Sequence, residues 1–243
     1  NNDRIWAVAN ETQIIRIDPV TCEMNQIMDI RTPHGTACKG IYDDGEYVWI
    51  LGTDLCTTLI KSTLSGEVVK KAHFPQSYYN IGATKSHIWL TGEYAGPVLK
   101  INKHTCKVEN EDHVPYAGSL TTTLYADERF VWVFAAKKFS KIDSETNEVC
   151  QTSISTAKAT YIYTALFDPD RNCFWVLYED RFLKVDYTTL EVVEVYKVPR
   201  TSYYSSIAQD KDNLYLSGSR NEKMIVINKD NFESSNHLHE PVS

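Results

Sequence analysis

A short apolar segment centred on one aromatic residue recurs along the whole chain. All five tryptophans of the protein occupy the same place in this segment, and a tyrosine takes that place in the sixth copy. The successive spacings of the aromatic residue are 43, 40, 43, 43 and 40 residues. The six copies are Ile5–Val8, Tyr47–Leu51, Ile88–Leu90, Val131–Phe134, Phe174–Leu177 and Leu214–Leu216. Such regular spacing from end to end predicts an architecture of repeated units.

A second recurring segment reads apolar, basic, apolar, then Asp or Asn. Alternation with a period of two predicts a strand that has one buried face. The closing Asp or Asn predicts a turn in which its side chain accepts hydrogen bonds from backbone amides two residues on. The copies are Ile15–Asp18, Leu99–Asn102, Ser140–Asp143, Leu183–Asp186 and Ile225–Asn228, while the second repeat departs from the pattern with Leu59–Ser62.

Two further strands complete the repeat. A polar outer strand follows the turn, and Pro often ends it because Pro cannot donate to a strand ladder. An inner strand rich in small residues precedes the aromatic segment and aligns to it without gaps. Its apolar residue lies eight positions before the aromatic, at Ile41, Ile81, Leu124, Phe167 and Ile207. A turn Asp lies five positions before the aromatic, at Asp44, Asp127, Asp170 and Asp210, with Thr84 in the third repeat.

A period near 40 residues with four strands per repeat is typical of a propeller blade. We therefore predict an all-β fold, a six-bladed β-propeller of antiparallel four-stranded blades, formed by residues 1–243 as a single domain. Only five copies of the inner strand are present, so either the first blade has three strands within this chain or residues outside it complete the blade. Because an open sheet edge is a liability, we expect the first and last repeats to pack side by side.

The repeat resembles that of the non-WD40 propellers of the NHL and YVTN-like group, which share an apolar-Trp-apolar strand followed by Lys-Ile-Asp-x-x-Thr. In this chain the pattern is clearest at Lys141–Thr146. The Gly-His and Trp-Asp signatures of WD40 repeats are absent. The resemblance covers the whole chain and implies the fold, but this superfamily includes binders, scaffolds and hydrolases.

Composition narrows the choice of partners. The net charge of −7 argues against nucleic acid or an anionic membrane as the main partner, because both require a basic face. No apolar run approaches the 18 residues of a membrane-spanning helix. The chain opens with Asn1-Asn2-Asp3, which is typical of a processed protein or a piece of a longer one.

The six cysteines form no Cys-x-x-Cys pair. This pattern favours free thiols that pack like small hydrophobic side chains, and with them a cytoplasmic location. The alternative is a set of disulfides in a secreted form, to which the glycosylation triplet Asn10–Thr12 adds weak support.

Tyrosines gather on the loops predicted to surround the mouth of the central channel, among Ser, Thr and Asn side chains. Tyrosine buries much area with few rotatable bonds and keeps a hydroxyl group for hydrogen bonding, which suits recognition of a partner. The predicted binding residues are His34, Tyr78, Tyr79, Tyr116, Tyr161, Tyr203, Tyr204 and Arg200. Alternatively, individual rings wedge between blades or cap the core. Lys39, Lys158 and Arg200 favour an acidic partner segment.

The sequence thus favours a non-catalytic protein–protein interaction module with no cofactor, no metal site and no catalytic residues. The alternative is a small-molecule binder or a lactonase-like hydrolase that uses the central channel. Hydrolases of that kind hold calcium through six to eight oxygen ligands. The inner strands here offer Asn80 and almost no other charged or amide side chain. The histidines show no zinc-binding spacing, and no nucleophile elbow or phosphate-binding loop is present.

Overall fold

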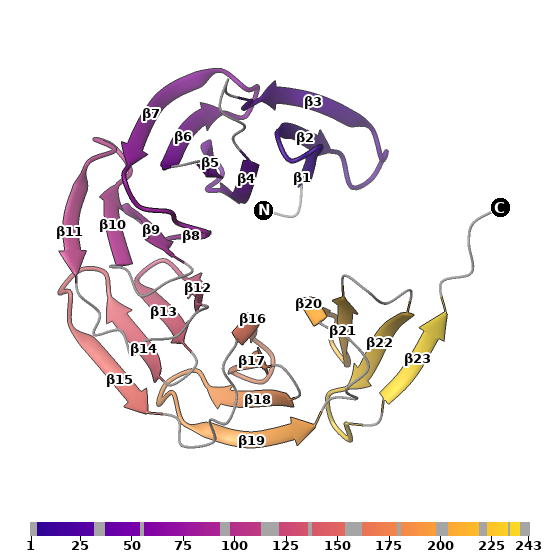
Figure 1. Cartoon of the computed structure of the whole chain (residues 1–243). Coiled ribbons are helices and arrows are strands. Elements are labelled where there is room, and N and C mark those ends of the chain that lie inside the picture. The colour runs from indigo at the N-terminus through magenta and orange to yellow at the C-terminus, as the bar shows by residue number, and fades with distance from the viewer. Residues whose placement is uncertain are drawn as a thin grey trace. The chain divides into compact units, whose positions relative to one another are not determined.

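The structure, a computed structural model, describes residues 4–31, 37–53, 56–92, 98–112, 122–135, 138–153, 162–178, 181–197, 204–218, 223–232 and 234–238. Within these ranges the regular secondary structure consists of β-strands only. The strands form six antiparallel sheets, one of three strands and five of four (Figure 1). Consecutive strands pair with one another in every sheet. These sheets confirm the prediction of a six-bladed β-propeller with a three-stranded first blade.

The sheets follow the predicted repeat closely. The first contains β1 (Ile5–Ala9), β2 (Gln13–Ile17) and β3 (Met24–Asp29). The second and third contain β4 (Ala37–Asp43), β5 (Tyr47–Thr53), β6 (Thr57–Thr63), β7 (Val68–Phe74), β8 (Asn80–Ala83), β9 (His87–Thr91), β10 (Val98–Asn102) and β11 (Val108–Asp112). The fourth contains β12 (Thr122–Ala126), β13 (Phe130–Ala135), β14 (Lys138–Asp143) and β15 (Val149–Ser153). The fifth and sixth contain β16 (Ile162–Asp168), β17 (Cys173–Tyr178), β18 (Arg181–Asp186), β19 (Val192–Lys197), β20 (Tyr204–Gln209), β21 (Asn213–Gly218), β22 (Lys223–Asn228) and β23 (Ser234–Leu238).

The chain divides into two compact units. The first comprises residues 1–115 and 126–131, and the second comprises residues 116–125 and 132–243. The first three sheets therefore belong to the first unit, and the last two belong to the second. A single domain over residues 1–243, and first and last repeats that pack side by side, both stay predictions.

The repeated tryptophan forms the core of its sheet. Trp49, Trp89, Trp132 and Trp175 have no exposed surface, and Trp6 is half-buried. A basic residue of the second recurring segment covers each of the four buried indoles. The ammonium-to-ring distances are 5.1 Å for Lys61 over Trp49, 5.7 Å for Lys100 over Trp89, 5.2 Å for Lys141 over Trp132 and 5.7 Å for Lys184 over Trp175. The alternation of basic and apolar residues therefore builds a cation–π pair into these four sheets.

The same basic residue also joins neighbouring sheets. The Nζ of Lys61 donates to the carbonyl of Lys103 at 3.1 Å, which links the second sheet to the third. The Nη1 of Arg16 donates to the carbonyl of Leu64 at 3.4 Å, which links the first sheet to the second. Each acceptor is the first residue after the third strand of its sheet.

The turn after that strand confirms the predicted role of Asp and Asn. The Oδ1 of Asp18 accepts the backbone N–H groups of Val20 and Thr21 at 2.8 and 2.9 Å. Equivalent bonds occur at Asn102, Asp143, Asp186 and Asn228. The residue four positions after each of these adopts positive φ although it is not glycine: Cys22, Cys106, Asn147, Leu190 and Phe232. A left-handed residue is therefore part of this hairpin loop in five of the six sheets.

The turn before the aromatic strand shows that the predicted gap-free alignment is wrong in the fifth repeat. Asp44 accepts the indole N–H of Trp49 at 2.8 Å, so this turn residue anchors the ring of its own sheet. In the fifth sheet the indole of Trp175 donates to Asp168 at 2.9 Å, not to Asp170. The turn there is two residues longer, because Asp168 pairs directly with Cys173. Asp168 is therefore the repeat equivalent of Asp44, and Ala165, not Phe167, is that of Ile41.

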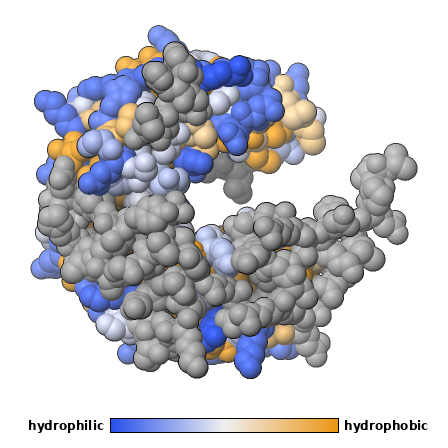
Figure 2. Space-filling model, viewed as in Figure 1, coloured by the Kyte–Doolittle hydropathy of each residue, from blue (hydrophilic) through white to orange (hydrophobic). Residues whose placement is uncertain are grey.

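The inner strands lie close together where the sequence places small residues. A Cβ atom added to Gly40 of β4 would lie 2.7 Å from the Cγ2 of Ile81 of β8. This contact explains why a glycine stands at that position. Among the described residues the first sheet has no inner strand beside β1, and its Ile5 and Val8 are exposed. Hydrophobic surface accordingly appears over β1–β3 at the upper right of Figure 2.

Candidate functional site

Most of the predicted Tyr-rich face lies outside the described residues. This applies to His34, Tyr116, Tyr161, Arg200 and Tyr203. Tyr204 begins β20, but its side chain is not described. Their role in recognition stays a prediction.

Tyr78 is a core residue. Its side chain is 2% exposed and packs edge-on against Phe74, with ring centres 6.3 Å apart. Its backbone N–H donates to the Oγ1 of Thr57 at 2.8 Å, and its hydroxyl donates to the Oε1 of Gln76 at 3.0 Å. The alternative interpretation, a ring that caps the core, therefore holds for Tyr78, and its aromatic face is not offered to a partner.

Tyr79 differs from its neighbour. It is half-buried, and the ammonium of the exposed Lys39 lies 5.8 Å from its ring centre. Its backbone N–H donates to the carbonyl of Thr91 at 2.9 Å, which fixes the chain just before β8. The described part of the predicted face is therefore a cation and an aromatic ring held together at the strand ends that carry the inter-blade loops.

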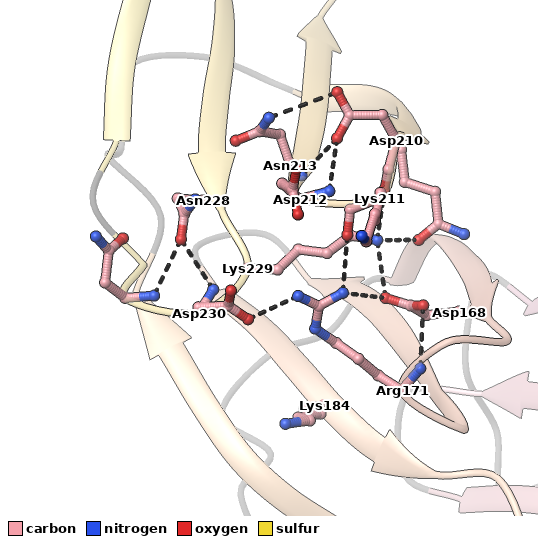
Figure 3. Close-up of polar contacts among 12 residues, drawn as sticks. Asp168, Arg171, Lys184, Asp210, Lys211, Asp212, Asn213, Asn228, Lys229 and Asp230 are labelled. Atoms are coloured by element: carbon pink, nitrogen blue, oxygen red, sulfur yellow. Dashed lines mark hydrogen bonds and ion pairs between the residues drawn. The ribbon is translucent and has the colours of Figure 1, made fainter.

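At the opposite strand ends of the second unit, a buried lysine joins the fifth and sixth sheets. The Nζ of Lys229 donates to the Oδ2 of Asp168 at 2.8 Å, the Oε1 of Gln209 at 2.9 Å and the carbonyl of Asp210 at 2.8 Å (Figure 3). The side chains of Lys229 and Asp168 are each only 1% exposed. Because an ammonium has three N–H groups, these three acceptors satisfy it completely.

The longer turn of the fifth repeat adds a second cation to this cluster. Arg171 lies 3.7 Å from Asp168, donates to the carbonyl of Lys211 at 2.9 Å and pairs with Asp230 at 2.6 Å. Figure 3 shows these groups directed toward one another from the turns of two sheets. These bonds join the turns of the fifth and sixth sheets, so the cluster holds the two sheets together.

The first unit repeats this arrangement in an open form. Lys103 follows Asn102 as Lys229 follows Asn228, and its Nζ lies 3.3 Å from the Oδ2 of Asp44. Its side chain is 18% exposed, compared with 1% for Lys229. Among the described residues Asp44 is the only hydrogen-bonding acceptor near this ammonium. The ring of Tyr42 lies 5.8 Å away.

Two polar hollows adjoin Lys103, and all residues that line them belong to the first unit. One, of about 630 Å³, is lined by Tyr42, Asp44, Ala83, Thr84, Lys85, Lys103, Asp127 and Glu128. The other, of about 520 Å³, is lined by Asp44, Glu46, Tyr47, Trp49, Lys61, Lys85, Ser86, Asn102, Lys103 and His104.

Ala83 explains why the larger hollow exists. It lies six positions before Trp89, as Gln209 lies six positions before Tyr215. In the second unit the amide of Gln209 fills the space beside Lys229, and its Nε2 also donates to the carbonyl of Phe167 at 2.6 Å. A methyl group in the same repeat position leaves that space vacant beside Lys103.

Hydrogen bonds and nearby lysines together set the protonation of both turn acids. Burial alone would raise the pKa of Asp168, but the bonds from Lys229 and Trp175 outweigh it and hold the pKa below its usual value. Burial likewise opposes the hydrogen bonds from Tyr47 and Trp49 and the positive charge of Lys103 at Asp44, and the net pKa is again lowered. Both carboxylates are therefore ionised at neutral pH.

Other reactive groups are dispersed. Among the described residues, no three His, Cys, Asp or Glu side chains lie close enough together to hold a metal ion. All six cysteines are free thiols, with Cys106 and Cys173 buried and Cys22 and Cys150 exposed. Burial raises the pKa of Cys173 to about 11, so this thiol stays protonated.

No helix in the described part of the chain is long and apolar enough to span a membrane.

Similarity to known proteins is limited to the fold. No family model and no curated protein matches the sequence. Among solved structures, the virginiamycin B lyase of Staphylococcus aureus has a TM-score of 0.73 at 16% identity, and the match covers 98% of this chain and 85% of the lyase. The chain has the fold of a six-bladed β-propeller.

Two other matches support the same fold. The extracellular domain of BT4673 from B. thetaiotaomicron has a TM-score of 0.74 at 15% identity, and the match covers 98% of this chain but spans only 36% of that structure. AztD from Citrobacter koseri has a TM-score of 0.58 at 14% identity, with 98% of this chain and 70% of AztD covered. At such identities the likeness carries the propeller architecture and no activity.

The sequence predicts a binding face at the strand ends that carry Tyr79, whereas the hollows beside Lys103 lie at the opposite strand ends. The dipeptide Asn-Lys occurs at the end of the recurring segment only in the third and sixth repeats, so a signal for Lys103 and Lys229 was present. The sequence alone does not show that the difference between Ala83 and Gln209 matters, because the turn acid beside them comes from the neighbouring sheet.

Proposed function

We propose that this chain is a non-catalytic recognition module that binds another protein or peptide through the strand ends that carry Tyr79 and Lys39. The observation that carries the proposal is the placement of this pair. A half-buried ring fixed by a backbone hydrogen bond loses little entropy on binding, and an exposed ammonium above it attracts an acidic partner segment.

The charged residues that recur along the repeats have structural roles. The repeated Asp and Lys residues described above are engaged in turns, indole contacts and inter-sheet bonds. Residues that depart from the repeat are the ones left for recognition. His34, Tyr116, Tyr161, Tyr203, Tyr204 and Arg200 belong to the same proposed face by their place in the repeat.

The test is a peptide selection with a matched variant. A displayed peptide library is selected on the wild-type chain, and the enriched peptides are titrated against a variant with Tyr79, Tyr116 and Tyr203 changed to Ala. We expect acidic peptides that lose at least about tenfold in affinity, equal to roughly 1.4 kcal/mol, while the variant keeps a cooperative unfolding transition. Peptides that bind wild type and variant equally would contradict the proposed face, and an unfolded variant would show that the rings belong to the core.

A further inference from the structure

We infer that the larger hollow beside Lys103 is a binding site for a carboxamide group, the side chain of a Gln in a partner peptide. The site lies at the strand ends opposite Tyr79 and is argued independently of the Tyr-rich face. The chain itself shows what fits there, because the same repeat position in the sixth sheet holds the amide of Gln209.

The ammonium of Lys103 has fewer hydrogen-bonding acceptors than it can use. Its ammonium has three N–H groups and one hydrogen-bonding acceptor among the described residues, Asp44 at 3.3 Å. Lys229 has a carboxylate, an amide oxygen and a carbonyl in the equivalent surroundings. An oxygen from a ligand would supply what Lys103 lacks.

The hollow offers space and access for a side chain of another molecule. The hollow of about 630 Å³ is lined by Ala83 where the sixth sheet has Gln209. Lys103 is 18% exposed at its edge, so an external side chain can reach the ammonium. The remaining volume accommodates the backbone of the residues on either side of the inserted side chain.

The charges around the hollow favour an amide over a carboxylate. Lys103 is neutralised by Asp44, and the other charged residues that line the hollow are Lys85, Asp127 and Glu128. An incoming carboxylate would be repelled by Asp44, whose ion pair with Lys103 is already neutral, whereas Lys229, paired with Asp168, is completed by the neutral amide of Gln209. A neutral carboxamide places its oxygen on Lys103 without that repulsion, and its NH₂ group can donate to the surrounding acids.

The experiment uses three capped peptides that differ in one residue, acetyl-Gly-Xaa-Gly-N-methylamide with Gln, Glu or norvaline at Xaa. Binding is followed by NMR shifts of the Lys103 side chain in the full chain. We expect saturable binding of the Gln peptide, with the Glu and norvaline peptides at least about tenfold weaker, because a hydrogen bond to a charged donor is lost or opposed. Equal binding of the Glu peptide, or no binding of the Gln peptide, would overturn the inference.

Two variants and a control make the test specific. Ala83→Gln should fill the hollow from within, raise the melting temperature and weaken the Gln peptide by at least about tenfold, as measured from backbone NMR shifts. Lys103→Met should weaken the peptide similarly, and it decides the matter if Ala83→Gln does not fold. Lys107→Met, an exposed lysine that lines neither hollow, should leave binding unchanged. Undiminished binding to folded Ala83→Gln or to Lys103→Met would refute the site.

Discussion

Lys103 in the first unit and Lys229 in the second occupy the same place in their repeats, yet their surroundings differ. Each follows the Asn that ends the third strand, and each reaches the turn acid that also holds a tryptophan of the preceding sheet. Lys229 is enclosed by three acceptors, whereas Lys103 has one and opens onto a hollow. The repeat thus places a lysine beside a turn acid in both units. The side chain at one neighbouring position, Gln209 or Ala83, decides whether the lysine is enclosed or opens onto a hollow.

The largest expected difference between the two regions is in stability. Lys229→Met removes the ammonium that pairs with the buried carboxylate of Asp168, and we expect a loss of about 3–5 kcal/mol in the free energy of unfolding. Lys103→Met removes a partly exposed ion pair and should cost about 1 kcal/mol or less. Urea titration of both variants measures the contrast. Equal losses would show that the two lysines contribute equally to stability, contrary to this expectation.

A smaller loss of stability is expected when the turn acid is replaced instead of the lysine. Asp168→Asn keeps an oxygen that can accept from Lys229 but removes the charge, and we expect a loss of about 1–3 kcal/mol at pH 7. Asp44→Asn should cost less because Lys103 keeps access to water. Unfolding monitored by circular dichroism for the two variants and wild type gives both values.

The pH dependence of these losses follows from the lowered pKa of Asp168. A carboxyl group that ionises more readily in the folded chain stabilises the fold above its ordinary pKa of 3.8, and this contribution is lost as the pH falls through the lowered value. The gap between wild type and Asp168→Asn should therefore narrow below about pH 4. A gap that stays constant down to pH 2 would mean that the carboxylate is not held by these bonds.

The smallest effects are expected where the two units are alike. Cys22 in the first unit and Asn147 in the second have φ of 59° and 61° at the same loop position. Replacement of Cys22 by Gly should stabilise the chain by about 1 kcal/mol, because glycine adopts this conformation without steric cost. Asn147→Gly should stabilise it by less, since Asn tolerates positive φ. Thermal unfolding checks both, and opposite signs would show that the loops are not equivalent.

The architecture could be read from the sequence because it depends on a side chain that is rare and regularly spaced. An aromatic ring stands at the same place in every repeat, four of these rings are fully buried indoles, and their period is the period of the sheets. The alignment failed at the fifth repeat, where two inserted residues made Asp170 look like the turn acid that Asp168 is. Spacing alone cannot locate an insertion inside a turn that contains two acids.

The candidate sites were less accessible to sequence reasoning. Tyr78 and Tyr79 are adjacent and chemically identical, yet one lies in the core and the other carries a lysine beside its ring. Likewise, Ala83 marks a hollow only because Lys103 of the same sheet and Asp44 of the preceding sheet meet beside it. Such sites arise from contacts between sheets, which no periodicity within one repeat encodes.

The most direct test of the comparison is the exchange of the lysine ammonium protons with water, measured by ¹⁵N NMR on lysine-labelled protein. Three occupied acceptors should slow exchange at Lys229 enough for its ammonium signal to persist under conditions in which that of Lys103 has vanished. The Ala83→Gln variant should then restore protection at Lys103. Equal protection of the two lysines in the wild-type chain would show that their hydrogen bonding does not differ.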